Sequence, residues 1–160
     1  ADAYIEKPFA MPYLLVQIEN LLESRIRLRQ NFANSPYIAT STMAQNKADE
    51  DFLNKMTDII KQNIENENFN VDNLAEEMCM SRTSLHRKVK GMTDMTPGDF
   101  IRIIRLKRAA ELLSEGNYQV SEICMLIGIR SLSYFSKIFQ KQFGILPKDF
   151  IKSRGALPPQ

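Results

Sequence analysis

Residues 131–140, SLSYFSKIFQ, repeat the pattern of residues 81–90, SRTSLHRKVK. Both stretches begin with serine, carry apolar residues at the fifth and ninth positions and place a cation at the seventh. The apolar spacing predicts two short helices with one buried stripe each, and either serine is a suitable N-cap. The remaining positions are polar or basic, except Leu132 and Ile138. We therefore expect two similar helices whose outward faces are free for a partner.

The repeat also covers the residues that precede both stretches. Four apolar positions recur at an offset of 49, with Val71, Leu74, Ala75 and Met78 matching Val120, Ile123, Cys124 and Ile127. After the turn the offset becomes 50, so each copy predicts a short helix, a tight turn and a second helix, which is a helix-turn-helix unit. Between the copies, Thr96 as N-cap, Pro97 and a stop at Gly116 predict one long helix. The expected fold is all-α, with two units joined by a long linker helix.

Composition limits the class of protein. With 160 residues and 44% hydrophobic residues the chain can bury a core. Cys79 and Cys124 have apolar neighbours and no CxxC spacing, which predicts two buried core residues in a reducing compartment, the cytoplasm. No apolar run is long enough for a membrane span, and no signal peptide is evident. The chain has one histidine, no phosphate-binding glycine loop and no metal-ligand spacing, so we expect no enzyme, no cofactor and no metal.

The net charge of +2 hides a polarised distribution. Residues 49–77 carry nine acidic side chains against two lysines, a net charge of −7. Residues 81–108 carry eight bases and two acids, a net +6, and residues 130–154 carry six bases and one acid, a net +5. Two basic blocks beside an acidic one suit an anionic partner on one face. Ordinary solvated helix faces are the alternative.

The second helix of a helix-turn-helix unit enters the DNA major groove with its N-terminal residues nearest the bases. Base-reading candidates on the two outward faces are Arg82, Thr83, His86, Arg87, Leu132, Ser133, Ser136 and Lys137. Candidate phosphate contacts are Lys88, Lys90, Arg105, Arg108, Lys141 and Lys148. Arginine can pair with guanine, hydroxyls bond several base edges, and leucine can contact a thymine methyl group. For each charged residue a plain solvated side chain is the alternative.

The long helix separates the two units by a distance that fits DNA. Its seventeen residues from Pro97 to Leu113 span about 25 Å. With the flanking units added, the second helices would lie about 34 Å apart, one turn of DNA. One monomer could then read two successive major grooves of double-stranded DNA. A helical protein-interaction module without DNA binding is the alternative, although its outward faces would be more apolar than these.

The chain from about Phe52 to Lys152 resembles the AraC-type DNA-binding domain. The resembling segments are LAEEMCMSRTSLHRKVKGMTDMTPGDFIRIIRLKRAAELL and VSEICMLIGIRSLSYFSKIFQKQFGILPKDF. The resemblance implies a seven-helix fold, a transcription regulator, and the same eight base-reading positions. Cys79 stands where this family usually has a turn glycine, which implies either a turn without positive φ or one under slight strain. Ile129 and Leu146 also depart from the family pattern.

The first residues resemble the end of a response-regulator receiver domain. ADAYIEKPF is similar to its last strand, with Lys7 as the phosphoryl-contacting lysine, Lys7–Pro8 as a cis peptide and Tyr4 as the switch aromatic. The phospho-accepting aspartate is absent. This implies a piece of a two-component regulator, either free-standing or a hybrid that includes a histidine kinase. Its partners would then be DNA, its own receiver and a second copy, with no membrane contact by this part of the chain.

The expected domain organisation follows from these segments. Residues 1–32 are the receiver remnant, 33–48 a linker, 49–154 the DNA-binding domain and 155–160 a tail. From about Pro12 the apolar residues Leu14, Ile18, Leu21, Leu28 and Phe32 follow a heptad-like spacing. This helix could form a coiled coil or pack on a neighbouring domain. We expect it to pass receiver pairing on to the DNA-binding domains.

Overall fold

The computed structural model describes residues 11–153, 155 and 157, and these residues contain helices and no β-strand. The helices are α1 (Met11–Asn34), the 3-10 helix η1 (Thr40–Met43), α2 (Lys47–Gln62), α3 (Val71–Glu77), α4 (Arg82–Thr93), α5 (Pro97–Glu115), α6 (Val120–Leu126), α7 (Leu132–Phe143) and α8 (Pro147–Lys152). The all-α prediction is confirmed. The strand expected at residues 3–6 lies outside the described residues, as do Tyr4, Lys7 and Pro8.

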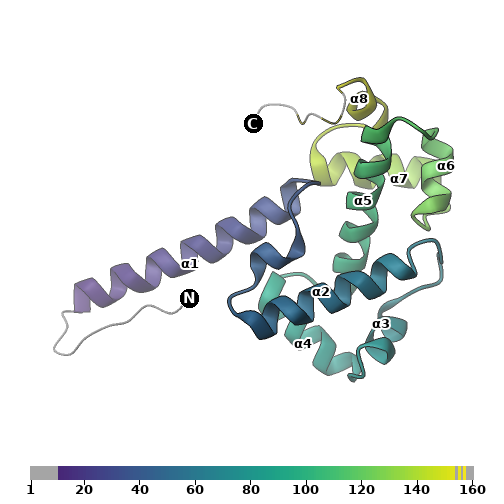
Figure 1. The fold of residues 1–160 in the computed structure, drawn as a ribbon. Helices are drawn as coiled ribbons and strands as arrows, with labels where there is room; N and C mark the ends of the chain where they lie inside the picture. Colours follow the sequence, from purple (N-terminus) through teal and green to yellow (C-terminus); the bar gives the residue numbers. More distant parts are fainter. Residues whose placement is uncertain (1–10, 154, 156, 158–160) are drawn as a thin grey trace.

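Two helix-turn-helix units lie on either side of α5 (Figure 1). The first unit is α3 and α4, and the second unit is α6 and α7. The serine caps form as expected, because the Ser81 side chain accepts from the Ser84 amide and that of Ser131 from the Tyr134 amide. The predicted start of α5 is also confirmed, since the Thr96 hydroxyl accepts from the Asp99 amide.

Each unit has its own hydrophobic core. The first core joins α2, α3, α4 and the first half of α5, and it also buries Phe32 and Met43. The second core joins the rest of α5 to α6, α7 and α8. At its centre the Phe139 ring lies 5.0–5.6 Å from the rings of Phe135, Phe143 and Phe150. Each buried aromatic side chain contributes about 1.5–3 kcal/mol of transfer free energy.

The turns inside the two units use different residues at the same left-handed position. Cys79 has φ +56° in the first unit, and Gly128 has φ +74° in the second. The turn with positive φ is therefore the correct one of the two alternatives for Cys79. Only Cys124 is buried as predicted, and burial raises the pKa of its thiol. Cys79 is exposed in the turn after α3 and is not part of the first core, so that part of the prediction was wrong.

Residues 35–46 depart from the expected linker because part of the segment is folded onto the first core. The segment contains η1, in which Thr40 and Met43 are buried. The Thr40 and Thr57 hydroxyls are 3.0 Å apart, and this hydrogen bond ties η1 to α2. The Tyr37 hydroxyl donates to the Gly155 carbonyl at 2.5 Å. The composition of the segment did not reveal these contacts because they depend on residues far away in the sequence.

Helix α1 extends away from the body, and its C-terminal end alone reaches it (Figure 1). Phe32 is its one fully buried side chain. Exposed apolar residues line much of the rest, including Ile18, Leu21, Leu22 and Ile26. Within the described part of the chain, no helix combines the length and apolar character needed to cross a membrane.

Candidate nucleic-acid interface

The outward face of α4 matches its prediction. Leu85 and Val89 are fully buried, so they anchor the helix against the first core. Arg82, Thr83, His86 and Arg87 are exposed on the other side, as is Lys90. Helix α4 therefore presents a polar and basic surface in its first two turns.

Helix α7 repeats this arrangement with different chemistry. Phe135 and Phe139 are fully buried. The candidate side chains Leu132, Ser133 and Lys137 are exposed, and Ser136 is half-buried. The structure thus brings the four candidate residues of α7 together in the first half of the helix. This group contains one cation, whereas the corresponding group on α4 contains two arginines.

The N-termini of α4 and α7 differ from those of the other body helices. Among α2–α8, these two helices alone have no acidic residue in the first turn. The others carry Asp49 and Glu50, Asp72, Asp99, Glu122 and Asp149, respectively. A helix N-terminus has a partial positive charge from its backbone dipoles and free amides, and an acidic side chain there would neutralise it. The two helices with open N-termini are therefore suited to a phosphate group.

The candidate phosphate contacts fall into different surroundings. Lys88 Nζ lies 4.3 Å from the centroid of the Phe52 ring, against α2. Lys90 is 3.8 Å from Asp94, and Arg108 is 2.8 Å from Glu111. These are exposed pairs, which contribute at most about 1 kcal/mol and can open for an anion.

Two further lysine candidates lie on α7 and α8. Lys141 is exposed on α7. Lys148, in the first turn of α8, lines an apolar hollow together with Leu132 and Ser136. Lys148 therefore lies beside the start of α7.

Arg105 is not available for phosphate, and its prediction was wrong. The side chain is buried, with 6% of the residue exposed. Its guanidinium donates to the carbonyls of Ile64 at 2.5 Å, Asn66 at 3.0 Å and Ile127 at 2.6 Å. Burial lowers its pKa from the ordinary value, but arginine stays charged at neutral pH. Arg105 thus joins the loop after α2 to the turn of the second unit.

Two exposed side chains of α7 were not among the site residues predicted from the sequence. Tyr134 has 50% of its surface exposed and lines a hollow with Arg102 and Arg130. Gln140 is exposed one turn beyond Lys137. A helical projection of residues 131–143 contains this signal, because Tyr134 and Gln140 fall outside the phenylalanine stripe.

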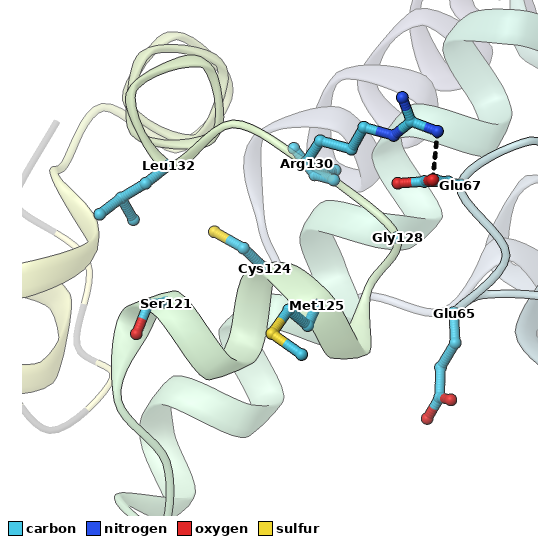
Figure 2. Close-up of a pocket in the computed structure, with 9 residues that line it drawn as sticks. Glu65, Glu67, Ser121, Cys124, Met125, Gly128, Arg130 and Leu132 are labelled. Atoms are coloured by element: carbon cyan, nitrogen blue, oxygen red, sulfur yellow. Dashed lines mark hydrogen bonds and ion pairs between the residues drawn. The ribbon is translucent and has the colours of Figure 1, made fainter.

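A third hollow lies beside α6 and the turn of the second unit (Figure 2). Ser121, Cys124 and Met125 come from α6, and Leu132 from the start of α7. Arg130 forms an ion pair with Glu67, drawn as a dashed line, which lowers the carboxyl pKa. No group of three His, Cys, Asp or Glu residues suited to a metal ion occurs among the residues that the structure describes.

Comparison with known proteins places both units in one family. A family model described as "Helix-turn-helix domain" matches residues 74–153, half of the chain. "Histidine kinase P4" of Formosa agariphila is 41% identical over 150 residues, which are 94% of this chain and 11% of that protein. The transcriptional activator RhaS of Salmonella arizonae is 33% identical over 85 residues, 53% of this chain and 31% of the activator. The chain thus spans a small part of each relative.

A solved structure agrees with the sequence comparisons. It is a transcriptional regulator from Chromobacterium violaceum, described as an AraC-type DNA-binding domain-containing protein. It is 27% identical, superposes with a TM-score of 0.62, and the match covers 68% of this chain and 96% of the other. The matched family model spans the reading helices α4 and α7 and the linker helix between them. The chain therefore belongs to the family of AraC-type helix-turn-helix domains.

Proposed function

We propose that this chain binds double-stranded DNA as the reading domain of a transcription regulator, with α4 and α7 in two successive major grooves. The observation that carries this proposal is the pair of open helix N-termini. Both reading helices begin with a serine cap and lack acidic residues in the first turn, unlike the other helices from α2 to α8. DNA phosphates favour such sites.

The outward-facing residues of the first two turns of each reading helix would contact the bases. In the first unit these are Arg82, Thr83, His86 and Arg87. In the second unit they are Leu132, Ser133, Ser136 and Lys137. Phosphate contacts would come from Lys90, Lys141 and Lys148, with Lys88 and Arg108 at the edges of the surface. Tyr134 and Gln140 add two polar side chains on α7.

Salt dependence tests this proposal directly. Fluorescence anisotropy of a labelled random-sequence duplex is measured with the chain at 50 and 200 mM salt. A protein that makes 6–10 phosphate contacts loses about 10³–10⁵-fold in affinity over this range, and we expect a loss of that order. An affinity that hardly changes would contradict the proposal. Absence of binding at the lower salt would favour a protein partner instead.

We further propose that the parent protein is a two-component regulator in which a receiver domain precedes α1. The resemblance of residues 1–9 to a receiver strand and the similarity to a histidine kinase support this. Receiver pairing would bring two DNA-binding domains together and raise their affinity through effective concentration. Such a regulator would act in the cytoplasm.

The exposed apolar residues of α1 offer a surface for receiver contact or for a second copy. Ile18 and Leu21 are 44% and 41% exposed. In the full-length parent, Ile18→Gln with Leu21→Gln should abolish the gain in DNA affinity that follows phosphorylation and leave the unphosphorylated affinity unchanged. A double variant that keeps the whole gain would refute the role of α1 in pairing.

A further inference from the structure

The last turn of α1 packs on the DNA-binding domain through one buried side chain. Phe32 is fully buried, and its ring stacks on Phe100 of α5 with centroids 6.2 Å apart and an interplanar angle of 18°. The rest of the helix extends into solvent (Figure 1). Because Phe32 belongs to the first core, the end of α1 is part of the domain and not of a linker.

Lys107 fastens this end of α1 to α5. Its Nζ donates to the carbonyls of Phe32 at 2.6 Å, Ser35 at 2.5 Å and Ile38 at 3.1 Å. It also lies 4.0 Å from the centroid of the Phe32 ring. The Phe32 carbonyl is one of the last four of α1, which have no partner within the helix, and a cation is favourable there. One buried side chain therefore holds both α1 and the segment that follows it.

Two more hydrogen bonds connect α1 to the reading helices. Arg29 Nη2 donates to the Gly91 carbonyl at 2.8 Å, in the last turn of α4. Gln142 Nε2, in the last turn of α7, donates to the Ala33 carbonyl at 2.6 Å. The end of α1 thus makes one bond to the C-terminal turn of each reading helix.

These bonds matter because the two units have separate cores. Apart from α5 itself, the two cores are connected by Arg105 and the Arg130–Glu67 pair. Tyr37, in the segment after α1, also reaches the second core, because its hydroxyl donates to the Gly155 carbonyl and its ring stacks on Phe150. Arg105 and Lys107 are two positions apart on α5, so their side chains leave the helix on opposite sides. Arg105 donates a hydrogen bond to the turn of the second unit, and Lys107 donates one to the end of α1. The α1 end is therefore a second connection, on the side of α5 opposite Arg105.

We infer that the last turn of α1 is a brace that fixes the angle between α4 and α7. Arg29 and Gln142 are its positioning residues, acting at the ends of the reading helices away from the proposed base contacts. The brace also sets the spacing of half-sites that the chain accepts, and this second part rests on the proposed DNA binding. A displacement of α1 moves both reading helices, which gives an upstream domain control over DNA reading.

The angle can be measured without DNA. Residual dipolar couplings of the α4 and α7 amides are recorded for the full chain, for Arg29→Ala with Gln142→Ala, and for the matched control Arg27→Ala with Gln30→Ala. Arg27 and Gln30 are exposed on α1, so the control removes the same residue types. One alignment tensor should fit both helices in the wild type and the control. Two tensors of different magnitude are expected for the double variant, and a single shared tensor there overturns the brace.

Lys107→Met provides a second, independent release of α1. It removes the three donated hydrogen bonds and leaves Arg29 and Gln142 in place, so the couplings should again require two tensors. Arg29→Lys, which keeps a cationic donor near the Gly91 carbonyl, should preserve the single tensor. If Lys107→Met does not fold, the double variant still decides the question.

The role of the brace in half-site spacing is tested by DNA binding. The duplex is first selected from a random library with the wild-type chain. Inserting one base pair between the half-sites should weaken wild-type binding by about tenfold or more, and the Arg29→Ala, Gln142→Ala variant by less than about threefold. Equal losses would overturn the spacing role. If the wild type binds no DNA but the couplings still separate in the variant, the proposed function fails and the brace stands.

Discussion

The two helix-turn-helix units share a backbone and differ in what surrounds their turns. In the second unit the turn glycine, Gly128, lies against the linker helix, and an added Cβ would be 2.0 Å from Arg105 Nη1 and 2.4 Å from the Ile64 carbonyl. In the first unit Cys79 occupies the matching left-handed position and is exposed. The same φ thus requires glycine in one unit and tolerates a side chain in the other. Whether a left-handed position requires glycine therefore depends on the space around its Cβ as well as on backbone strain.

The helix ends show the same contrast. The C-cap residue that follows α4 is Asp94, with φ +61°, and the one that follows α7 is Gly144, with φ +77°. The first unit therefore holds side-chain-bearing residues at both left-handed positions, each at a cost of about 1–2 kcal/mol. The second unit has glycine at both, and its core contains three phenylalanines of α7. We expect the second unit to be the better packed and less strained of the two.

The largest effect is expected for Gly128→Ala. The methyl group would displace Arg105 and disturb hydrogen bonds to three carbonyls, each worth about 1.5–3 kcal/mol for a charged donor, in addition to the strain of a positive φ. The free energy of unfolding should fall by about 3 kcal/mol or more, measured by urea denaturation followed by circular dichroism.

Gly144→Ala is the matched control for that substitution. Gly144 also has positive φ, but an added Cβ would meet no atom within 4 Å. Its loss should be limited to backbone strain, about 1 kcal/mol. Equal losses at the two glycines would show that Arg105 yields readily, and the contrast between the turns would then be one of strain alone.

The next largest effect concerns the DNA-reading faces. The first unit offers two arginines, which can bond guanine with two hydrogen bonds, and the second offers hydroxyls and one lysine. Arg87→Ala should weaken binding to a selected duplex by about 10–100-fold, equivalent to about 1–3 kcal/mol. Lys137→Ala should cost about tenfold or less, because lysine is a point charge without the two-pronged hydrogen-bond geometry of arginine. Anisotropy titrations of both variants at two salt concentrations test this ranking, and the reverse order would make the second unit the main reader.

Local patterns were sufficient to predict the helices of both units. Ser81, Ser131 and Thr96 cap their helices as expected, because a cap depends on residues three positions away. The outward faces of α4 and α7 followed from the 3.6-residue period. The same reasoning failed for α5, in which twelve of nineteen residues are buried. A helix that is buried on nearly all sides has no polar face to identify, so the sequence did not distinguish Arg105 from a phosphate contact.

Apart from Tyr134 and Gln140, the missed features depend on contacts between distant parts of the chain. Lys107 binds carbonyls of residues 32–38, about seventy positions earlier in the sequence. The composition of residues 33–48 suggested a linker because serine, threonine and asparagine are typical of loops. Thr40 is nevertheless buried through its bond with Thr57. Such pairings become visible once the helices are packed together.

Lys107 lies where the first unit meets α1, and its ionisation should appear in the stability. Burial lowers its pKa to about 7, against about 10.4 in an unfolded chain. The folded chain then binds fewer protons than the unfolded chain between these values, so the free energy of unfolding should rise with pH from about 7 to 9. The slope is at most about 1.4 kcal/mol per pH unit.

Urea denaturation at pH 7, 8 and 9 measures this slope, with Lys107→Met as the control. Asp58, Lys61, Arg108 and Glu111 line the same hollow as Lys107, and the control keeps all four of them. The wild type should gain stability relative to Lys107→Met as the pH rises. Parallel curves for the two proteins would mean that the three carbonyls hold the ammonium charged throughout this range.

The smallest effect is expected for Cys79→Gly, which makes the first turn resemble the second. A left-handed conformation costs a residue with a Cβ about 1–2 kcal/mol, and glycine loses about 0.5–1 kcal/mol more conformational entropy on folding. The net stabilisation should be about 0.5 kcal/mol, seen as a rise of about 1–2 °C in Tm. Because Cys79 is exposed, loss of its side chain leaves no cavity.

Cys79→Ala is the matched control, because it keeps the Cβ and should leave Tm unchanged. If alanine stabilises the chain as much as glycine does, the thiol and not the backbone is unfavourable, and strain would not distinguish the two turns. If glycine alone stabilises the chain, the backbone of Cys79 is strained in the exposed turn. The buried turn has no such strain because Arg105 leaves no space for a Cβ at Gly128.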